Sequence, residues 1–288
     1  MNEKKLLQAT IILCLIIACF SLQGCTTNKG DVDLKKGEIS SIQADTSVLL
    51  KPENEKSPTC NVTIDFMYLR PSSEQDSLSM QINDHLQRIT FGTSCNKLQP
   101  EASIKAMRDS YITSYREELL PYYEADLKNG VLPEEMPGWY NYEYNISSEL
   151  KTVRDSILNY SVTHYENTGG AHPNTFMNWR NINANTGKVL TKADVFTPDS
   201  DKQIIDLIAK QLVAEANKRL ETDTITSLQG LCENGVLLNV DLYVPNNFLI
   251  TDQGVTFLYN RYDIAPYVFG DFQLNVPYAE IENLMIMK

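Results

Sequence analysis

Residues 139–191 read WYNYEYNISSELKTVRDSILNYSVTHYENTGGAHPNTFMNWRNINANTGKVLT, and this stretch decides the fold. Apolar and polar residues alternate in two runs, the period of a half-buried strand. The apolar members are Tyr140, Tyr142, Tyr144 and Ile146 in the first run, and Leu158, Tyr160, Val162 and His164 in the second. A third strand is expected over 174–184, and Asn185-Thr186-Gly187 is a hairpin-turn signal. The stretch therefore predicts an antiparallel meander.

Upstream of the meander, we expect one strand and two helices. Val62, Ile64, Phe66 and Tyr68 alternate with polar residues after Cys60, which predicts a strand. Apolar residues recur at helical spacing over 74–89. A longer helix is expected from Pro100, a residue favoured at the first helical position, with Pro121 ending or kinking it.

Downstream of the meander, helices and strands are again expected in separate blocks. The spacing predicts a helix over 201–220, strands over 238–244, 255–259 and 272–276, and a closing helix from Pro277 through Leu284. Strands joined mostly by hairpins, with helices segregated between them, indicate an α+β fold. We expect antiparallel sheets with helices packed on one side, arranged as two intertwined subdomains.

The first 25 residues carry an export signal. Lys4 and Lys5 precede an almost wholly apolar run, Leu6 to Phe20, which is shorter than the ~20 residues of a membrane span and typical of a secretory signal. Leu22-Gln23-Gly24-Cys25 then resembles the lipobox of bacterial lipoproteins. This resemblance implies cleavage before Cys25 and acylation of that cysteine, which ties the chain to an envelope membrane through its lipid. We expect an outer-membrane, periplasmic or surface location.

The charge and composition of the chain limit which partners and which domains are expected. The full chain carries a net charge of −12; residues 1–24 contribute +1 of it, so the mature chain carries −13. This acidity argues against binding nucleic acid, and is compatible both with a cationic partner and with mere solubility. Thr26 to Pro58 is polar and predicts a flexible tether, in which only Val48-Leu49-Leu50 docks as a short strand. The expected organisation is signal peptide 1–24, lipid anchor and tether 25–58, N-terminal subdomain 59–138 and C-terminal subdomain 139–288.

The sequence offers no recognisable catalytic motif. Its three histidines, His85, His164 and His172, are not paired at metal-ligand spacing, and no nucleophile elbow or phosphate loop occurs. We therefore assign no catalytic residue, no metal and no cofactor. The carboxylates of Glu134, Glu135 and Asp252 cannot be paired in space from the sequence. The aromatic cluster formed by Trp139, Tyr140, Tyr142 and Tyr144 suits stacking on sugars, and equally suits one buried and one exposed strand face.

One loop stands out as a candidate ligand loop: Gly169, Gly170, His172 and Asn174, with Pro173 between the last two. Two glycines permit positive φ and the proline restricts the chain, so the loop is expected to hold a defined shape with Gly169 or Gly170 at φ > 0. Two interpretations remain open. The loop presents its backbone and imidazole to a ligand, or the glycines let it cross a neighbouring strand closely.

Three cysteines remain if Cys25 is lipidated: Cys60, Cys95 and Cys232. An eight-residue strand of roughly 26 Å followed by a sixteen-residue helix of roughly 24 Å would bring Cys95 back to Cys60. We therefore predict a Cys60–Cys95 disulfide, with three free thiols as the competing interpretation.

Three segments resemble a known family. They are the run from Tyr165 to Asn174 containing Thr168-Gly169-Gly170-Ala171-His172, the turn at 185–188 with the residues up to 196, and the C-terminal run from 248 to 278. The chain resembles, over roughly 60–286, the domain of unknown function shared by the extracytoplasmic part of the anti-sigma factor RsiV and the N-terminal region of PdaC. The RsiV domain recognises lysozyme, so the resemblance implies a cationic protein as one ligand class. Neither the anti-sigma role nor the deacetylase activity is implied, because each resides in a segment that has no counterpart here.

Two function classes follow. The first is a lipid-anchored, non-catalytic envelope module that binds a protein, peptide or glycan. The second is an envelope hydrolase acting on cell-wall or dietary polysaccharide. The missing catalytic motifs favour the first. A cleft with a titratable group near His172 would favour the second.

Overall fold

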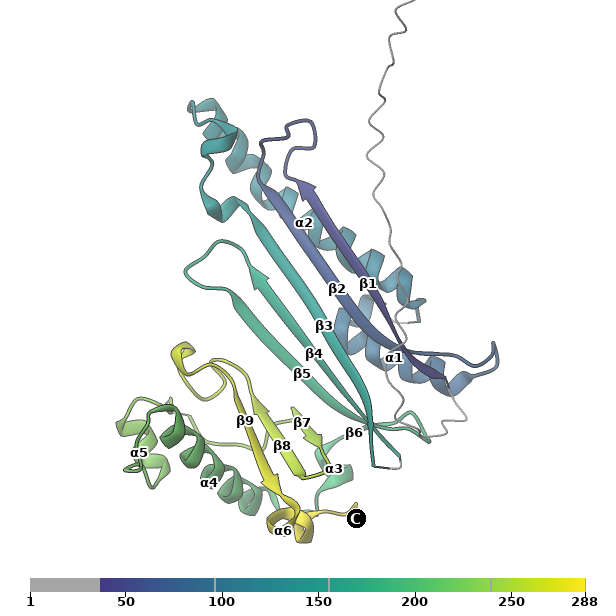
Figure 1. The fold of residues 1–288 in the computed structure, drawn as a ribbon, viewed down its shortest axis with the longest axis vertical. Helices are drawn as coiled ribbons and strands as arrows, with labels where there is room; N and C mark the ends of the chain where they lie inside the picture. The colour runs from purple at the N-terminus through teal and green to yellow at the C-terminus, as the bar shows by residue number, and fades with distance from the viewer. Residues whose placement is uncertain (1–36, 96, 155, 239, 288) are drawn as a thin grey trace, which may run out of the picture.

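The computed structural model describes residues 37–287, except residues 96, 155 and 239. The predicted signal peptide, the lipidation site Cys25 and the tether up to residue 36 lie outside the described residues. Two β-sheets, each with its own helices, make up the described part of the chain (Figure 1).

The larger sheet has six strands in the order of the sequence. They are β1 (Glu38–Leu49), β2 (Thr59–Arg70), β3 (Tyr142–Val153), β4 (Ile157–Asn167), β5 (Asn174–Asn183) and β6 (Val189–Leu190). The predicted meander is confirmed as β3 to β5, and the Asn185-Thr186-Gly187 turn connects β5 to β6. All neighbours pair antiparallel except β2 and β3, which run parallel.

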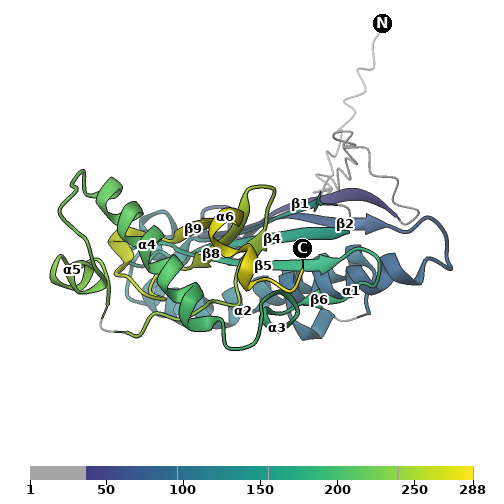
Figure 2. The same cartoon turned by 90° about the horizontal axis from the view of Figure 1, so that it is seen from below.

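Two helices pack on the larger sheet, on the same side of it (Figure 2). They are α1 (Ser77–Phe91) and α2 (Pro100–Lys128); the short helices η1 (Thr93–Cys95), η2 (Pro133–Glu135) and η3 (Gly138–Tyr140) flank α2. The rings of Phe66 on β2 and Phe91 on α1 lie 5.0 Å apart between centroids within this core. Helix α2 continues through Pro121, so the predicted end or kink there is not a helix terminus.

The smaller sheet has three antiparallel strands, β7 (Phe248–Ile250), β8 (Gly254–Tyr259) and β9 (Phe272–Pro277). Its helices are α3 (Lys192–Val195), α4 (Asp201–Arg219), α5 (Leu228–Glu233), η4 (Tyr267–Phe269), α6 (Tyr278–Ile281) and η5 (Glu282–Leu284). Ile204, Ile208 and Leu212 of α4 are fully buried in a second core. The α+β class and the two subdomains are confirmed.

The tether is shorter than predicted. Glu38–Leu49, placed in the tether from sequence, forms the twelve-residue strand β1, which pairs with β2 along its whole length. Ile42 and Leu50 are buried, whereas exposed polar residues such as Gln43, Asp45 and Ser47 intervene. An edge strand of this kind has few apolar residues, which explains why the sequence pattern was missed.

The boundary predicted at residues 138 and 139 is also wrong. Strand β3, assigned to the C-terminal subdomain, pairs with β2 of the N-terminal one. The first core extends to Ala184, and the second is built mainly from residues after Leu190. The subdomains therefore divide between β5 and α3, and the candidate ligand loop, called the TGGAHP loop after its residues 168–173, belongs to the first of them. The strand predicted over 238–244 is not found in the described residues of that range, where the amide of Leu238 donates to the carbonyl of Ile264 at 2.8 Å.

The predicted disulfide is corrected as well: Cys60 and Cys95 are both buried free thiols, and Cys232 is an exposed one. Strand β2 is longer than expected, and α1 returns along only part of it. Phe91, near Cys95, packs against Phe66, and Cys60 lies six residues before Phe66, roughly 20 Å away at ~3.3 Å per residue. A disulfide needs Cα atoms within ~7 Å.

Buried asparagines join the two subdomains. Asn181 donates from Nδ2 to the carbonyl of Phe248 and accepts from the amide of Ile250, at 2.9 and 2.8 Å. From the other side, Asn260 accepts from the Met177 amide at 2.8 Å and donates to the Met177 carbonyl at 3.0 Å. These side chains satisfy the backbone of β5 and β7 as a neighbouring strand would. They hold the smaller sheet against the edge of the larger one.

Candidate functional site

The TGGAHP loop connects β4 to β5 and is shaped by Gly169. Gly169 has φ 71°, as predicted for one of the two glycines, and its amide donates to Oδ1 of Asn167 at 3.0 Å. A Cβ on Gly169 would lie 2.0 Å from Cα of Trp139, whereas a Cβ on Gly170 would meet nothing within 4 Å. The close-crossing interpretation therefore holds for Gly169. The close approach to Trp139 does not assign a role to His172, which lies three residues after Gly169 and is exposed.

His172 packs against the loop between β8 and β9, which belongs to the other subdomain. Its imidazole stacks on the ring of Tyr267, with centroids 3.7 Å apart and planes 15° apart. The hydroxyl of Tyr262 lies 3.4 Å from Nε2 of His172, and Tyr267 donates from its hydroxyl to the carbonyl of Pro173 at 3.0 Å. We call His172, Arg261, Tyr262, Tyr267 and Val268 the junction surface.

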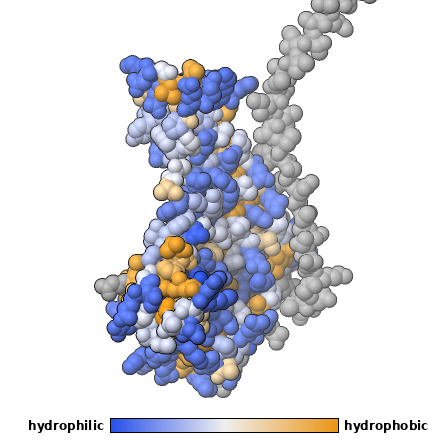
Figure 3. Space-filling view, turned by 60° about the vertical axis from the view of Figure 1, so that its left-hand side comes forward, coloured by the Kyte–Doolittle hydropathy of each residue, from blue (hydrophilic) through white to orange (hydrophobic). Residues whose placement is uncertain are grey.

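Two members of the junction surface are strongly exposed. Tyr262 is 56% exposed and Val268 is 83% exposed. Figure 3 shows that hydrophobic residues also gather in one patch on the lower half of the face that it presents. Exposed aromatic side chains held by contacts between two subdomains, with an exposed apolar side chain beside them in the sequence, are typical of a binding surface.

Tyr262 is held in an unusual backbone conformation. Its φ is 68°, in the left-handed region that residues other than glycine rarely adopt. The turn around it is closed by Asp263, whose carboxylate accepts from the amide of Asn260 at 2.8 Å and whose own amide donates to the carbonyl of Asn260 at 3.0 Å. Burial raises the pKa of Asp263, while the hydrogen bond from Asn260 partly offsets that effect. The turn thus fixes Tyr262 pointing outward.

Arg261 gives the junction surface a local positive charge. Its guanidinium carbon lies 4.8 Å from the centre of the Tyr267 ring, a cation–π contact. Nη1 donates to the hydroxyls of Thr175 and Tyr267, at 3.2 and 3.4 Å, so Arg261 bridges the two subdomains. Its Nε is buried and has no partner.

A second group of titratable residues lies at the base of the loop, beside α2. The hydroxyl of Tyr111 donates to Glu166 at 2.9 Å, and the Tyr111 ring stacks on Tyr144 at 4.4 Å. The Tyr144 hydroxyl in turn pairs with Nδ1 of His164 at 2.9 Å. Burial lowers the pKa of His164, and burial followed by the nearby Glu166 raises the pKa of Tyr144 to about 12. These groups are therefore neutral tyrosines and a neutral imidazole around one carboxylate.

This second group does not make a hydrolytic centre by itself. Acid/base hydrolysis of a glycosidic bond needs two carboxyl groups flanking the substrate. Glu166 is the one carboxylate hydrogen-bonded in this group, and it is held by Tyr111. Among the described residues, no cluster of three or more His, Cys, Asp or Glu side chains is placed to hold a metal ion.

The remaining residues singled out from the sequence lie apart from one another. Asn174 is exposed at the start of β5, opposite Glu166 across the strand pair. His85 lies on α1 beside Arg88, and burial, together with that arginine, lowers its pKa. Cys60 is enclosed, and burial, offset in part by Arg116, raises the pKa of its thiol to about 11, so it stays protonated. Trp139 stacks on Tyr140 at 3.9 Å.

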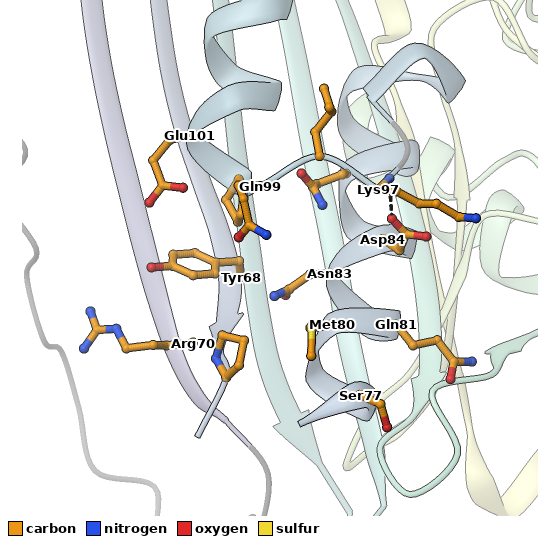
Figure 4. A pocket seen from close by; sticks show the side chains of 14 residues that line it. Tyr68, Arg70, Ser77, Met80, Gln81, Asn83, Asp84, Lys97, Gln99 and Glu101 are labelled. Carbon is orange, nitrogen blue, oxygen red and sulfur yellow. Dashed lines mark hydrogen bonds between the residues drawn. The ribbon is translucent and has the colours of Figure 1, made fainter. Parts of the chain in front are cut away.

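A cavity of about 510 Å³ opens at a different place, between the end of β2, α1 and the start of α2 (Figure 4). Tyr68, Asn83 and Gln99 lie around its centre, with Arg70 and Glu101 at one side. The amide of Asn83 already binds the backbone of Leu69 through both its oxygen and its nitrogen, at 2.8 and 2.7 Å. None of the TGGAHP loop residues lines this cavity.

Sequence reasoning found the loop but missed its partners. Tyr262 and Tyr267 belong to the C-terminal run that carries the family resemblance, yet nothing local connects them to His172, about ninety residues upstream. Arg261 gave no signal at all. The one signal in the sequence was that the TGGAHP loop and the C-terminal run both carry residues of the family resemblance that no apolar pattern explains.

Fold and site together define an α+β protein whose two subdomains share one exposed surface. Comparison with known families finds two regions: residues 53–175 match the family described as deacetylase PdaC, and residues 193–279 match the protein family of unknown function DUF3298. The two matched regions follow one another along the chain and do not overlap. The first match ends with the TGGAHP loop and the second contains Tyr262 and Tyr267, so both contribute to the junction surface.

Solved structures agree with the fold. A DUF3298 family member from Bacteroides fragilis is 29% identical, with a TM-score of 0.76, over 86% of this chain and 93% of that one. A DUF3298 family protein from Pseudomonas aeruginosa, at 16% identity and a TM-score of 0.55 over 87% and 95% of the two chains, shares the fold. No curated protein matches the chain.

Proposed function

We propose that this protein is a lipid-anchored cell-envelope module that binds a macromolecular ligand, a protein, peptide or glycan, without chemical turnover. The observation that carries the proposal is the junction surface: exposed Tyr262 and stacked His172 and Tyr267 are held by both subdomains. Large aromatic side chains fixed at low conformational cost are favoured as binding anchors.

The arrangement around His172 supports binding over hydrolysis. The imidazole stacks on Tyr267 and lies 3.4 Å from the hydroxyl of Tyr262, and neither partner is a serine, cysteine or carboxylate side chain. No carboxylate is hydrogen-bonded to His172 among the described contacts. The cavity near α1 lies away from the loop. A rigid, exposed surface suits contact with an extended ligand.

Capture of envelope components on the immobilised full chain tests the proposal. Material that binds the unaltered chain should bind the double variant His172→Ala, Tyr262→Ala much less. The matched control is Tyr68→Ala, which alters the separate cavity and should retain binding. Equal capture by the double variant, or progressive hydrolysis of the captured material, would contradict a non-catalytic junction site.

The membrane tether is tested separately. The order of charged start, apolar run and Leu22-Gln23-Gly24-Cys25 supports lipidation of Cys25. Cells supplied with a clickable fatty acid should label the unaltered protein and leave Cys25→Ala unlabelled. Equal label on the two proteins would end the lipoprotein assignment.

A further inference from the structure

We propose that the ligand of the junction surface is an uncharged polysaccharide chain, with a sugar ring stacking on Tyr262. This inference rests on the proposed binding function and adds the class of ligand. It follows from three properties of the surface: the placement of its rings, its local charge and its rigidity.

The rings of the junction surface form a layered platform. His172 stacks on Tyr267 at 3.7 Å, and the Tyr262 ring lies 5.9 Å from that of Tyr267 at an angle of 37°. The face of an aromatic ring is electron-rich. The C–H groups on one face of a sugar ring carry small positive charges, so a pyranose packs flat on such a face while its hydroxyls point sideways toward polar groups.

Polar groups for those hydroxyls surround the rings. The hydroxyl of Tyr262 and the imidazole of His172 lie 3.4 Å apart, a loose contact that leaves both able to bind a further partner. A sugar stacked on Tyr262 would thus meet a hydroxyl and an imidazole at its edge, which serve as donors and acceptors alike.

Local charge argues against a cationic peptide at this place. The ring of Tyr267 already has the guanidinium of Arg261 4.8 Å from its centre, so the cation–π site is filled by the protein itself. A lysine or arginine of a ligand would approach that fixed positive charge. A polyanion would be repelled by the protein as a whole, because the chain carries a net charge of −12. An uncharged ligand avoids both kinds of electrostatic repulsion.

The backbone at Tyr262 supports a preformed site. Residues other than glycine rarely adopt φ 68°, and such positions persist where surrounding contacts impose them. Here the turn between Asn260 and Asp263 imposes it, and the result is an outward-pointing ring that is 56% exposed. A ring fixed before binding loses little freedom on contact.

Affinity electrophoresis of the full chain in detergent tests the proposal. Separate gels contain xylan, laminarin, galactomannan or, as the acidic arm, polygalacturonate. At least one of the three uncharged polysaccharides should retard the protein. Tyr262→Ala should weaken that binding by roughly tenfold or more, as for a central aromatic contact, and Tyr262→Phe, which keeps the ring, should restore most of it.

Controls separate this proposal from the binding function on which it rests. Tyr68→Ala should be retarded like the unaltered chain, and far-ultraviolet circular dichroism should show each variant folded. No retardation by any uncharged polysaccharide, retardation by polygalacturonate alone, or loss in Tyr68→Ala but not in Tyr262→Ala overturns the carbohydrate assignment. If envelope capture depends on Tyr262 but the captured material is destroyed by protease, the binding function stands and the carbohydrate proposal fails.

Discussion

Gly169 is the residue on which the shape of the loop depends. Its positive φ and the 2.0 Å separation between a hypothetical Cβ and Cα of Trp139 both exclude a side chain. We predict that Gly169→Ala destabilises the protein by about 2 kcal/mol or more, because the backbone of Trp139 must move. Urea unfolding of the full chain measures this difference.

Gly170 provides the matched control for that substitution. It lies next in the chain, without positive φ and with open space around its Cα. Gly170→Ala should change the free energy of unfolding by no more than about 0.5 kcal/mol, as for ordinary surface positions. Equal effects of the two substitutions would show that the loop does not cross Trp139 closely.

Asp76 is a second residue with a defined role. Burial disfavours its charge, but hydrogen bonds from the amides of Ser72 and Ser79, the Ser79 hydroxyl and the amide of Gly37 outweigh burial, and they hold its pKa well below the usual range. It caps α1 and ties the start of β1 to that helix. We predict that Asp76→Ala lowers the free energy of unfolding at pH 7 by about 1–2 kcal/mol.

The pH dependence of that loss has a definite sign. A carboxyl group with a depressed folded pKa contributes its stability above the unfolded pKa of about 3.9, and loses it as pH falls toward the folded value. The difference between Asp76→Ala and the unaltered chain should therefore narrow below about pH 4. Glu74→Ala, an exposed neighbour, should show no such difference. If the difference in free energy of unfolding between Asp76→Ala and the unaltered chain stays constant from pH 7 to pH 3, the charge of Asp76 does not contribute to the cap.

Between elements, the decisive contacts are those that asparagines make across the two sheets. Asn181 is 1% exposed and serves both the carbonyl of Phe248 and the amide of Ile250. Its removal leaves two buried backbone groups of β7 unpaired, at a cost of about 1–3 kcal/mol each. Asn181→Ala should therefore lower the stability of the smaller subdomain, seen as faster hydrogen exchange in β7 to β9. Asn61→Ala, on an exposed position of β2, should leave exchange there unchanged.

Some elements follow from sequence pattern alone and others do not. The strands of the meander and the helices α1 and α4 carry apolar periodicity over many residues and were predicted close to their observed bounds, whereas α2 was predicted at its start but continues to Lys128, beyond Pro121. Strand β1 escaped because an edge strand buries little, and polar Ser40, Ser41 and Asp45 mask Ile42. The parallel pairing of β2 with β3 escaped because its connection spans both α1 and α2, and no local signal specifies it.

In the candidate site, too, the local features were predictable from the sequence and the long-range contacts were not. The shape of the TGGAHP loop was predictable, because two glycines and a proline constrain the backbone locally. Its contact with Tyr267 was not, because it depends on how the smaller sheet docks on the edge of β5. The predicted Cys60–Cys95 bridge failed for a related reason: it assumed equal lengths for a strand and a helix that differ in length.

At the level of the whole molecule, the two subdomains have separate cores and act as one support for the junction surface. The β4–β5 loop belongs to the larger sheet and the β8–β9 loop to the smaller one (Figure 1). The β4–β5 loop contributes the imidazole of His172, and the β8–β9 loop contributes the rings of Tyr262 and Tyr267. Their combination yields the stacked group, which explains why both regions of the chain are needed for the proposed function.

Hydrogen–deuterium exchange of the full chain tests this account most directly, with and without the envelope material that it captures. We predict that ligand slows exchange in two segments far apart in sequence, 168–175 and 260–270, while the cavity segments 68–71, 77–87 and 97–101 exchange as before. Protection confined to the cavity segments, or to only one of the two loops, would contradict a ligand site shared by both subdomains.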